Sequence, residues 1–138
     1  MSSLSMLPRL LLDTHIVVRW LGGVKRLSRE QARVLERAVQ RTEPIALSAT
    51  TLVEIAVLMS ERKLALKMSL DEFFGILQSN PIFRILPITY EIASDVFSLM
   101  ALKDPSDRAI VATARVHRLQ LVTSDQRIIE SRLVPVVE

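Results

Sequence analysis

The sequence predicts an α/β domain, a three-layer α/β/α sandwich with a central parallel β-sheet. Two features of the chain lead to this fold class. Short apolar runs, suited to strands that are buried on both faces, alternate along the chain with longer segments that begin at helix-capping residues. Most successive runs are separated by a segment that is long enough for two helices. This spacing is typical of a parallel sheet with helices on both sides.

Five short runs are expected to form the strands of this sheet. The first ends in three leucines and is closed by Asp13, and the second and third each lie next to a proline. Their apolar character requires burial on both faces, as in the interior of a sandwich. The expected strands cover residues 9–12, 44–47, 82–86, 121–123 and 134–137.

The helices between these strands begin at recognisable capping sequences. Capping boxes open at Ser28 and at Ser69, and Asp104 is followed by a proline at the first helical position. Gly22-Gly23 ends the first helix and turns the chain. The expected helices cover residues 14–21, 28–41, 48–63, 69–79, 89–102 and 104–118.

The size and composition of the chain fit one compact domain. Its 138 residues are 49% hydrophobic, which supplies a core and excludes wholesale disorder. We therefore expect a single domain over residues 1–138, with residues 1–7 as a loose N-terminal segment. The chain has no cysteine, which excludes disulfides, thiolate metal sites and cysteine nucleophiles and fits a reducing cytoplasm.

Charge and hydropathy exclude further classes of protein. No apolar run reaches the roughly 18 residues of a membrane-spanning helix. Residues 7–21 are a poor signal peptide because charged residues interrupt them and no basic residue precedes them, so we expect a cytoplasmic protein with no membrane partner. The net charge of +3 mildly favours a polyanionic partner, and only three glycines leave no room for glycine-rich phosphate loops.

Two acidic residues follow expected strands directly. Asp13 ends the first strand, and Asp125 lies just past the fourth. In open α/β sheets, ligands bind outside the carboxyl ends of the strands, so these two acids face each other there if the two strands are neighbours. The alternative for each is a purely local role as a helix N-cap or turn residue.

Two further acids lie on helices that should pack inward. Glu54 is part of the most apolar helix, where it ends a narrow polar stripe that includes Thr50 and Thr51. The alternative for Glu54 is a buried ion pair or a protonated carboxyl. Asp107 shares a helix face with apolar residues, and its alternative is simple helix-start chemistry, the role that we assign to Asp104.

These four acids predict a metal site if they converge. Two unit charges about 4 Å apart repel by about 4 kcal/mol at an effective dielectric constant of 20, so such a cluster requires a cation. Ligands that are all oxygen favour a hard metal, Mg²⁺ or Mn²⁺. The expected ligands are Asp13, Glu54, Asp107 and Asp125.

Four motifs occur in an order and spacing that resemble the PIN domains of VapC-type toxins. Together they extend over about residues 9–135, and four motifs in order are far more specific than any one of them. The motifs are Leu-Leu-Leu-Asp13-Thr14-His15, Ser48-Ala-Thr-Thr-Leu-Val-Glu54, Asp104-Pro-Ser-Asp107-Arg108 and Leu-Val-Thr123-Ser-Asp125.

The resemblance implies a PIN-like fold and a metal-dependent endoribonuclease that a cognate antitoxin holds inactive. It places the family's four acidic residues at Asp13, Glu54, Asp107 and Asp125, and it implies an RNA substrate and a homodimer. We expect Asp13 and Asp107 to be the principal ligands of Mg²⁺ or Mn²⁺, with the other two acids completing the site. Thr14 and Thr123 are expected to orient these carboxylates.

Other polar residues carry weaker expectations. Arginines at 29, 33, 37 and 41 follow one helix face, either as a phosphate track or as an ordinary solvated face. We expect Arg108 to pair with a neighbouring acid, with a contact to RNA as the alternative, and His15 to satisfy a hydrogen bond rather than to act in catalysis. The alternative for the whole chain is a non-catalytic PIN-fold module that binds RNA or a protein; Mg²⁺-dependent RNA cleavage separates the two.

Overall fold

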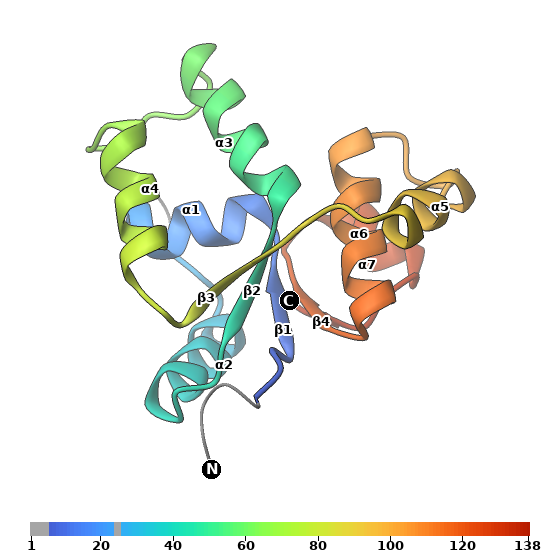
Figure 1. Ribbon diagram of the computed structural model, residues 1–138, viewed down its shortest axis with the longest axis horizontal. Coiled ribbons are helices and arrows are strands. Elements are labelled where there is room, and N and C mark those ends of the chain that lie inside the picture. The colour runs from blue at the N-terminus through green and yellow to red at the C-terminus, as the bar shows by residue number, and fades with distance from the viewer. Residues whose placement is uncertain (1–5, 24–25) are drawn as a thin grey trace.

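Five parallel strands form one sheet in the order β3-β2-β1-β4-β5 (Figure 1). The computed structural model describes residues 6–23 and 26–138. Because β1 pairs with both β2 and β4, the first and fourth strands are neighbours, as the convergence of their terminal acids requires. The strands are β1 (Leu10–Leu12), β2 (Ile45–Ser48), β3 (Phe83–Leu86), β4 (Gln120–Val122) and β5 (Val136–Val137).

Helices cover both faces of the sheet and complete the three-layer sandwich that the sequence predicts (Figure 1). One layer contains α1 (Thr14–Gly22), α2 (Arg29–Gln40), α3 (Ala49–Ser60) and α4 (Leu70–Ser79). The other contains α5 (Tyr90–Ser98), α6 (Pro105–His117) and α7 (Gln126–Ser131).

Each strand supplies side chains to two hydrophobic cores, one on each face. Leu10 and Leu12 point into the core beneath α1–α4, whereas Leu11 points into the core beneath α5–α7. Successive side chains of a strand lie on opposite faces, so an uninterrupted apolar run is what a strand between two helical layers needs. All three leucines are buried.

The helix starts form where their capping residues predict them. Ser28 and Gln31 make a complete capping box on α2, and Ser69 and Glu72 make another on α4. In each box the serine hydroxyl accepts from a backbone N–H that has no partner within the helix. Gly23 ends α1 at φ 64°, in the left-handed region that glycine adopts without strain.

The largest differences between the observed and the expected elements lie at three helices, whereas the strand bounds differ by one or two residues. Helix α5 ends at Ser98 and not near residue 102, and α3 ends at Ser60 and not near residue 63. The sequence analysis missed α7 altogether. The expectation of a loose segment over residues 1–7 falls largely on residues 1–5, which lie outside the described residues.

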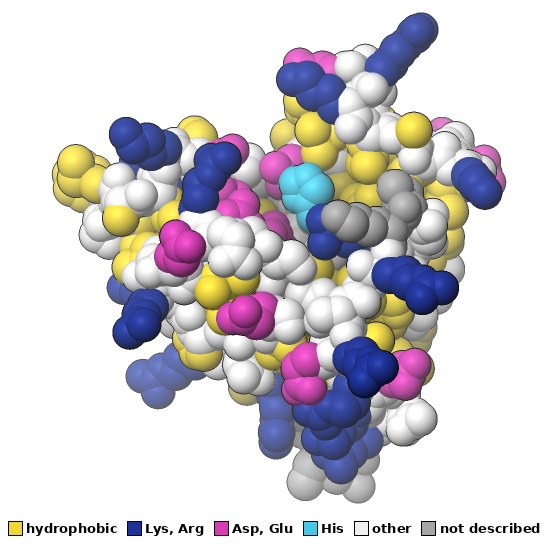
Figure 2. All heavy atoms as spheres, turned by 180° about the vertical axis from the view of Figure 1, so that it is seen from behind, with side chains coloured by type: hydrophobic (Ala, Val, Ile, Leu, Met, Phe, Trp, Pro, Cys, Tyr) yellow, Lys and Arg dark blue, Asp and Glu magenta, His cyan; other side chains and the backbone are white. Residues whose placement is uncertain are grey.

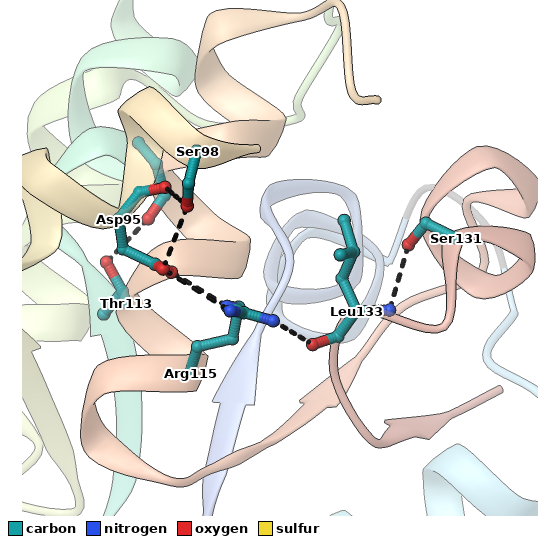
Figure 3. A network of polar contacts seen from close by, with 7 residues as sticks. Asp95, Ser98, Thr113, Arg115, Ser131 and Leu133 are labelled. Carbon is teal, nitrogen blue, oxygen red and sulfur yellow. Dashed lines mark hydrogen bonds and ion pairs between the residues drawn. The ribbon is translucent and has the colours of Figure 1, made fainter. Parts of the chain in front are cut away.

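An arginine of α6 connects three parts of the second helical layer (Figure 3). The Arg115 Nε donates to Asp95 of α5 at 2.9 Å, and its Nη1 donates to the carbonyl of Leu133 at 2.9 Å. Because the contact is partly exposed, it fixes the position of α6 more than it stabilises the fold. It holds α6, which carries Asp107, against α5 and the segment that leads to β5.

No helix within residues 6–23 and 26–138 combines the length and the apolar character that a membrane span requires.

Candidate active site

Asp13 links the end of β1 to the start of α1 at the carboxyl edge of the sheet. Its Oδ1 accepts from the Thr14 backbone N–H at 2.8 Å, and its Oδ2 accepts from the Thr123 hydroxyl at 2.7 Å. The residue is only 5% exposed, and burial raises the pKa of its carboxyl. The Thr123 hydrogen bond, the charge of His15 and the Thr14 N–H oppose that increase, whereas Asp125 adds to it.

Asp125 lies three residues past the end of β4, at the start of α7. Its Oδ1 accepts from the backbone N–H groups of Arg127 at 2.9 Å and Ile128 at 3.3 Å, which caps α7. Its own N–H donates to the Thr123 hydroxyl oxygen at 3.1 Å. One hydroxyl therefore connects the two strand ends, because it donates to Asp13 and accepts from Asp125.

The N-capping roles expected as alternatives for Asp13 and Asp125 are confirmed, since each carboxylate begins a helix. A carboxylate that caps a helix can still bind a cation. A carboxylate offers about four lone pairs, and the protein donors engage only some of these on each residue.

Glu54 of α3 approaches the same edge from the first helical layer. The Thr14 hydroxyl donates to its Oε1 and lies 3.0 Å from the hydroxyl of Thr51. Glu54 is half-buried and forms no ion pair within residues 6–23 and 26–138, so the expected alternative of a buried ion pair does not hold there. Thr14 orients Glu54 as the sequence predicts, whereas the contribution of Thr51 was missed.

Asp107 lies in the first turn of α6, and Asp104 takes the capping role there. Asp104 accepts from the backbone N–H groups of Ser106 at 2.8 Å and Asp107 at 3.3 Å. Burial, the largest cause, and neighbouring negative charges raise the pKa of Asp107 from 3.8 to about 7. From the largest contribution to the smallest, these charges are Asp104, Asp125, Asp13 and Glu54.

The donor set fits a hard divalent cation. All four expected ligands supply carboxylate oxygens, and the charges of the other three contribute, after burial, to the raised pKa of Asp107. Over the described ranges, no three acidic or histidine side chains already surround a single point at metal-binding distance.

Hollows lined by these acids open along the carboxyl edge. One is lined by Asp13, His15, Arg19, Ser124 and Asp125. A second includes Lys103, Asp104, Asp107 and Arg127, and a third includes Thr50, Glu54 and Ser106. Figure 2 shows acidic side chains gathered at a notch in the surface, with a histidine and basic side chains around it.

One expectation about a basic side chain needs correction. Arg108 donates from Nε to the carbonyl of Leu102 and not to an acid in the described part of the chain, because the connection between α5 and α6 places that carbonyl at the start of α6. His15 is exposed and lines the first hollow. On α2, Arg33 pairs with Glu30 and Arg41 lies 3.9 Å from Glu43, which agrees with the solvated-face alternative.

The basic residues Arg19, Lys103 and Arg127 at these hollows were not identified from the sequence. Their positions close to the candidate site residues in the sequence could have identified them. Arg127 follows Asp125 by two residues, Lys103 precedes Asp104, and Arg19 lies one helical turn after His15.

Comparisons with known proteins identify the family. The PIN-domain family model matches residues 10–132. Ribonuclease VapC22 of Mycobacterium tuberculosis is 30% identical over 120 residues, which cover 86% of this chain and 88% of that protein. Among solved structures, FitAcB from Neisseria gonorrhoeae has a TM-score of 0.69 at 23% identity, covering 94% of this chain and 96% of that one. VapBC2 from Rickettsia felis, bound to a promoter DNA fragment, has a TM-score of 0.68 at 17% identity and covers 92% and 96%. The chain therefore belongs to the PIN-domain family.

Proposed function

We propose that this chain is a Mg²⁺- or Mn²⁺-dependent endoribonuclease and the toxin of a toxin–antitoxin pair. The observation that carries the proposal is the hydroxyl of Thr123 that joins Asp13 and Asp125 at the carboxyl edge of the sheet, near Asp107, whose pKa burial and neighbouring carboxylates raise to about 7. The 30% identity to a ribonuclease of the same family supports RNA as the substrate. The solved neighbours that are toxin–antitoxin complexes support an antitoxin partner.

In this proposal, Asp13 and Asp107 are the principal metal ligands, and Asp125 and Glu54 complete the site. The bound cation would lower the pKa of the attacking water and neutralise charge on the phosphate in the transition state. The protein's own contribution is orientation. Thr123 fixes the carboxylate of Asp13, and Thr14 fixes that of Glu54, so that each presents a defined oxygen to the site.

RNA cleavage with and without EDTA tests the proposal. Purified protein should cleave RNA in Mg²⁺ or Mn²⁺, and EDTA should stop cleavage. Asp107→Asn should lose at least about 100-fold in rate, because it removes a proposed ligand of the cation that neutralises charge in the transition state. Asp71→Asn, which neutralises an exposed aspartate of α4, is the matched control and should keep full activity.

Binding of RNA without cleavage by the natural protein in Mg²⁺ and Mn²⁺ would support the non-catalytic module instead. A cleavage rate that Asp107→Asn and Asp71→Asn share would indicate a contaminating nuclease and contradict the proposal.

Growth and co-purification test the toxin role. Expression of the natural chain should arrest bacterial growth, whereas Asp13→Asn should be tolerated at the same soluble level. The natural chain should co-purify with a small protein whose tail places an arginine or another cation near the acids. Equal toxicity of the two proteins, or a tail docked far from Asp13 and Asp107, would contradict this part of the proposal.

A homodimer is the solution form that we propose. Helix α5 and the turn after it expose Tyr90, Phe97 and Met100 at 96%, 84% and 75%, and exposed apolar side chains favour association. Light scattering should give twice the chain mass of 15.6 kDa. A monomer at micromolar concentration would contradict this proposal without affecting the proposed chemistry.

A further inference from the structure

Basic side chains flank the acids on both sides of the sheet edge. Arg19 of α1 lines the hollow that contains Asp13 and Asp125. Arg127 of α7 lines the hollow that contains Asp107, together with Lys103. Helix α1 packs in the first helical layer, whereas α6 and α7 pack in the second, so the two basic groups belong to opposite layers of the sandwich.

These cations are close to acids without being neutralised by them. Within the described ranges, the basic residues that form ion pairs are Arg33, Arg41, Lys63 and Arg115. Arg19, Lys103 and Arg127 form no such pair with a described residue. An unpaired guanidinium at the rim of an acidic site is available to an anion from outside, and its planar donors match a phosphate.

We propose that a single RNA strand crosses the carboxyl edge of the sheet from the α1 layer to the α6–α7 layer. Arg19 binds a phosphate on one side of the scissile phosphate, and Arg127, assisted by Lys103, binds one on the other side. This inference rests on the proposed ribonuclease function and adds the path of the strand and the residues that fix it.

The position of Arg19 suits a neighbouring phosphate better than the scissile one. Arg19 lies six residues beyond Asp13, which is about 9 Å along the axis of α1 at 1.5 Å per residue. The two flanking cations also offset the repulsion between the carboxylates and an approaching polyanion.

The arginine track of α2 offers a different path, which serves as the comparison. Helix α2 begins near the carboxyl edge, where Gln31 donates to the Thr123 carbonyl at 3.3 Å. It then leads to the amino end of β2, so Arg37 in its last turn lies away from the acids. Arg37 is exposed, and its charge can be removed without touching the proposed path.

Salt-dependent binding of a labelled single-stranded RNA tests the path, with EDTA present to prevent cleavage. Each phosphate contact contributes about 0.7 to the slope of log K against log salt concentration, which is about fivefold in affinity at 0.1 M salt. Arg19→Gln and Arg127→Gln should each lose one such increment, and the double variant two. Arg37→Gln should match the natural chain.

A kinetic measurement in Mg²⁺ separates phosphate binding from a structural role. Arg19→Gln and Arg127→Gln should raise KM about fivefold with little change in kcat, because a flanking contact is equally strong in the ground and transition states. Arg19→Lys keeps the charge and should restore the slope. Thermal melting of each variant checks that it is folded.

The possible failures are distinguishable. If the natural chain neither binds nor cleaves RNA, the proposed function is wrong and this inference falls with it. If the natural chain cleaves RNA but both glutamine variants keep its slope and KM, the path is wrong and the function stands. A slope lost only in Arg37→Gln would place the RNA along α2.

Discussion

The two places where acids meet at the carboxyl edge are built differently. At the ends of β1 and β4, Asp13 and Asp125 cap helices with the same carboxylates that are proposed to bind metal. In the first turn of α6 the tasks are divided, since Asp104 caps the helix and Asp107 lies further in with a pKa of about 7. At the strand ends the same carboxylates therefore cap helices and are proposed to bind the metal, whereas in α6 two different residues have these two roles.

Thr123→Val should produce the largest effect on stability. It removes the hydroxyl that holds both strand ends and leaves the Oδ2 of the buried Asp13 without a donor, which costs about 1–3 kcal/mol of unfolding free energy. Metal affinity should fall about 10- to 100-fold, because a hydrogen bond that orients a ligand is lost. Denaturant unfolding and Mn²⁺ titration measure the two effects.

The control is Thr113→Val, which removes a buried hydroxyl that donates only to the Ala109 carbonyl of its own helix. That carbonyl keeps its helical partner, so the cost should be smaller and Mn²⁺ affinity unchanged. Equal effects of the two variants would mean that Thr123 does not couple the strand ends.

The two acids of α6 should respond to substitution with opposite signs. Asp104→Ala removes the N-cap and should cost about 1 kcal/mol. Asp107→Asn removes a half-buried charge that other carboxylates repel, so metal-free stability should stay the same or increase. Urea unfolding in EDTA checks both; a loss in Asp107→Asn as large as that in Asp104→Ala would show that Asp107 has a capping role after all.

The sequence predicts the strand ends better than it predicts α6 and its surroundings. Leucine triplets, capping boxes and acids after strands are local signals, so the sheet, most helix starts and the positions of Asp13 and Asp125 follow from them. The Thr14–Glu54 contact joins residues 40 positions apart, and its existence depends on how α3 packs. The orienting roles of Thr14 and Thr123 were nevertheless expected from their places beside the acids.

The misses have physical causes. Helix α7 has six residues and one fully buried side chain, Ile128, which is too little for a periodic pattern. Leu99 and Leu102 continue the apolar pattern of α5 and are buried, but a turn joins them through the Leu102 N–H and the Leu99 carbonyl. The two leucines are therefore buried at a spacing that fits a helix, although the backbone there forms a turn.

The pH dependence of metal-free stability should differ between the natural chain and Asp107→Asn. A carboxyl whose pKa rises on folding binds more protons in the folded state, so its contribution to stability falls as pH rises. For Asp107 the fall begins near its ordinary pKa of 3.8 and ends near 7. The raised pKa of Asp13 acts in the same direction in both proteins and largely cancels in the comparison.

Melting curves in EDTA between pH 4 and pH 8 measure this effect. The stability of Asp107→Asn relative to the natural chain should increase from about pH 4 to about pH 7 and then level off. A difference that is constant with pH would mean that neither burial nor the neighbouring carboxylates raise the pKa of Asp107 on folding.

The most direct test of the central claim, that these acids bind a divalent cation, is thermal stability in EDTA and in Mn²⁺. The natural chain should gain roughly 2.7 kcal/mol at about 100 times the dissociation constant. Asp107→Asn should be at least as stable in EDTA and lose most of the gain at the same Mn²⁺ concentration, whereas Asp71→Asn should keep it. An Asp107→Asn protein that is destabilised in EDTA and keeps the full Mn²⁺ shift would contradict the claim.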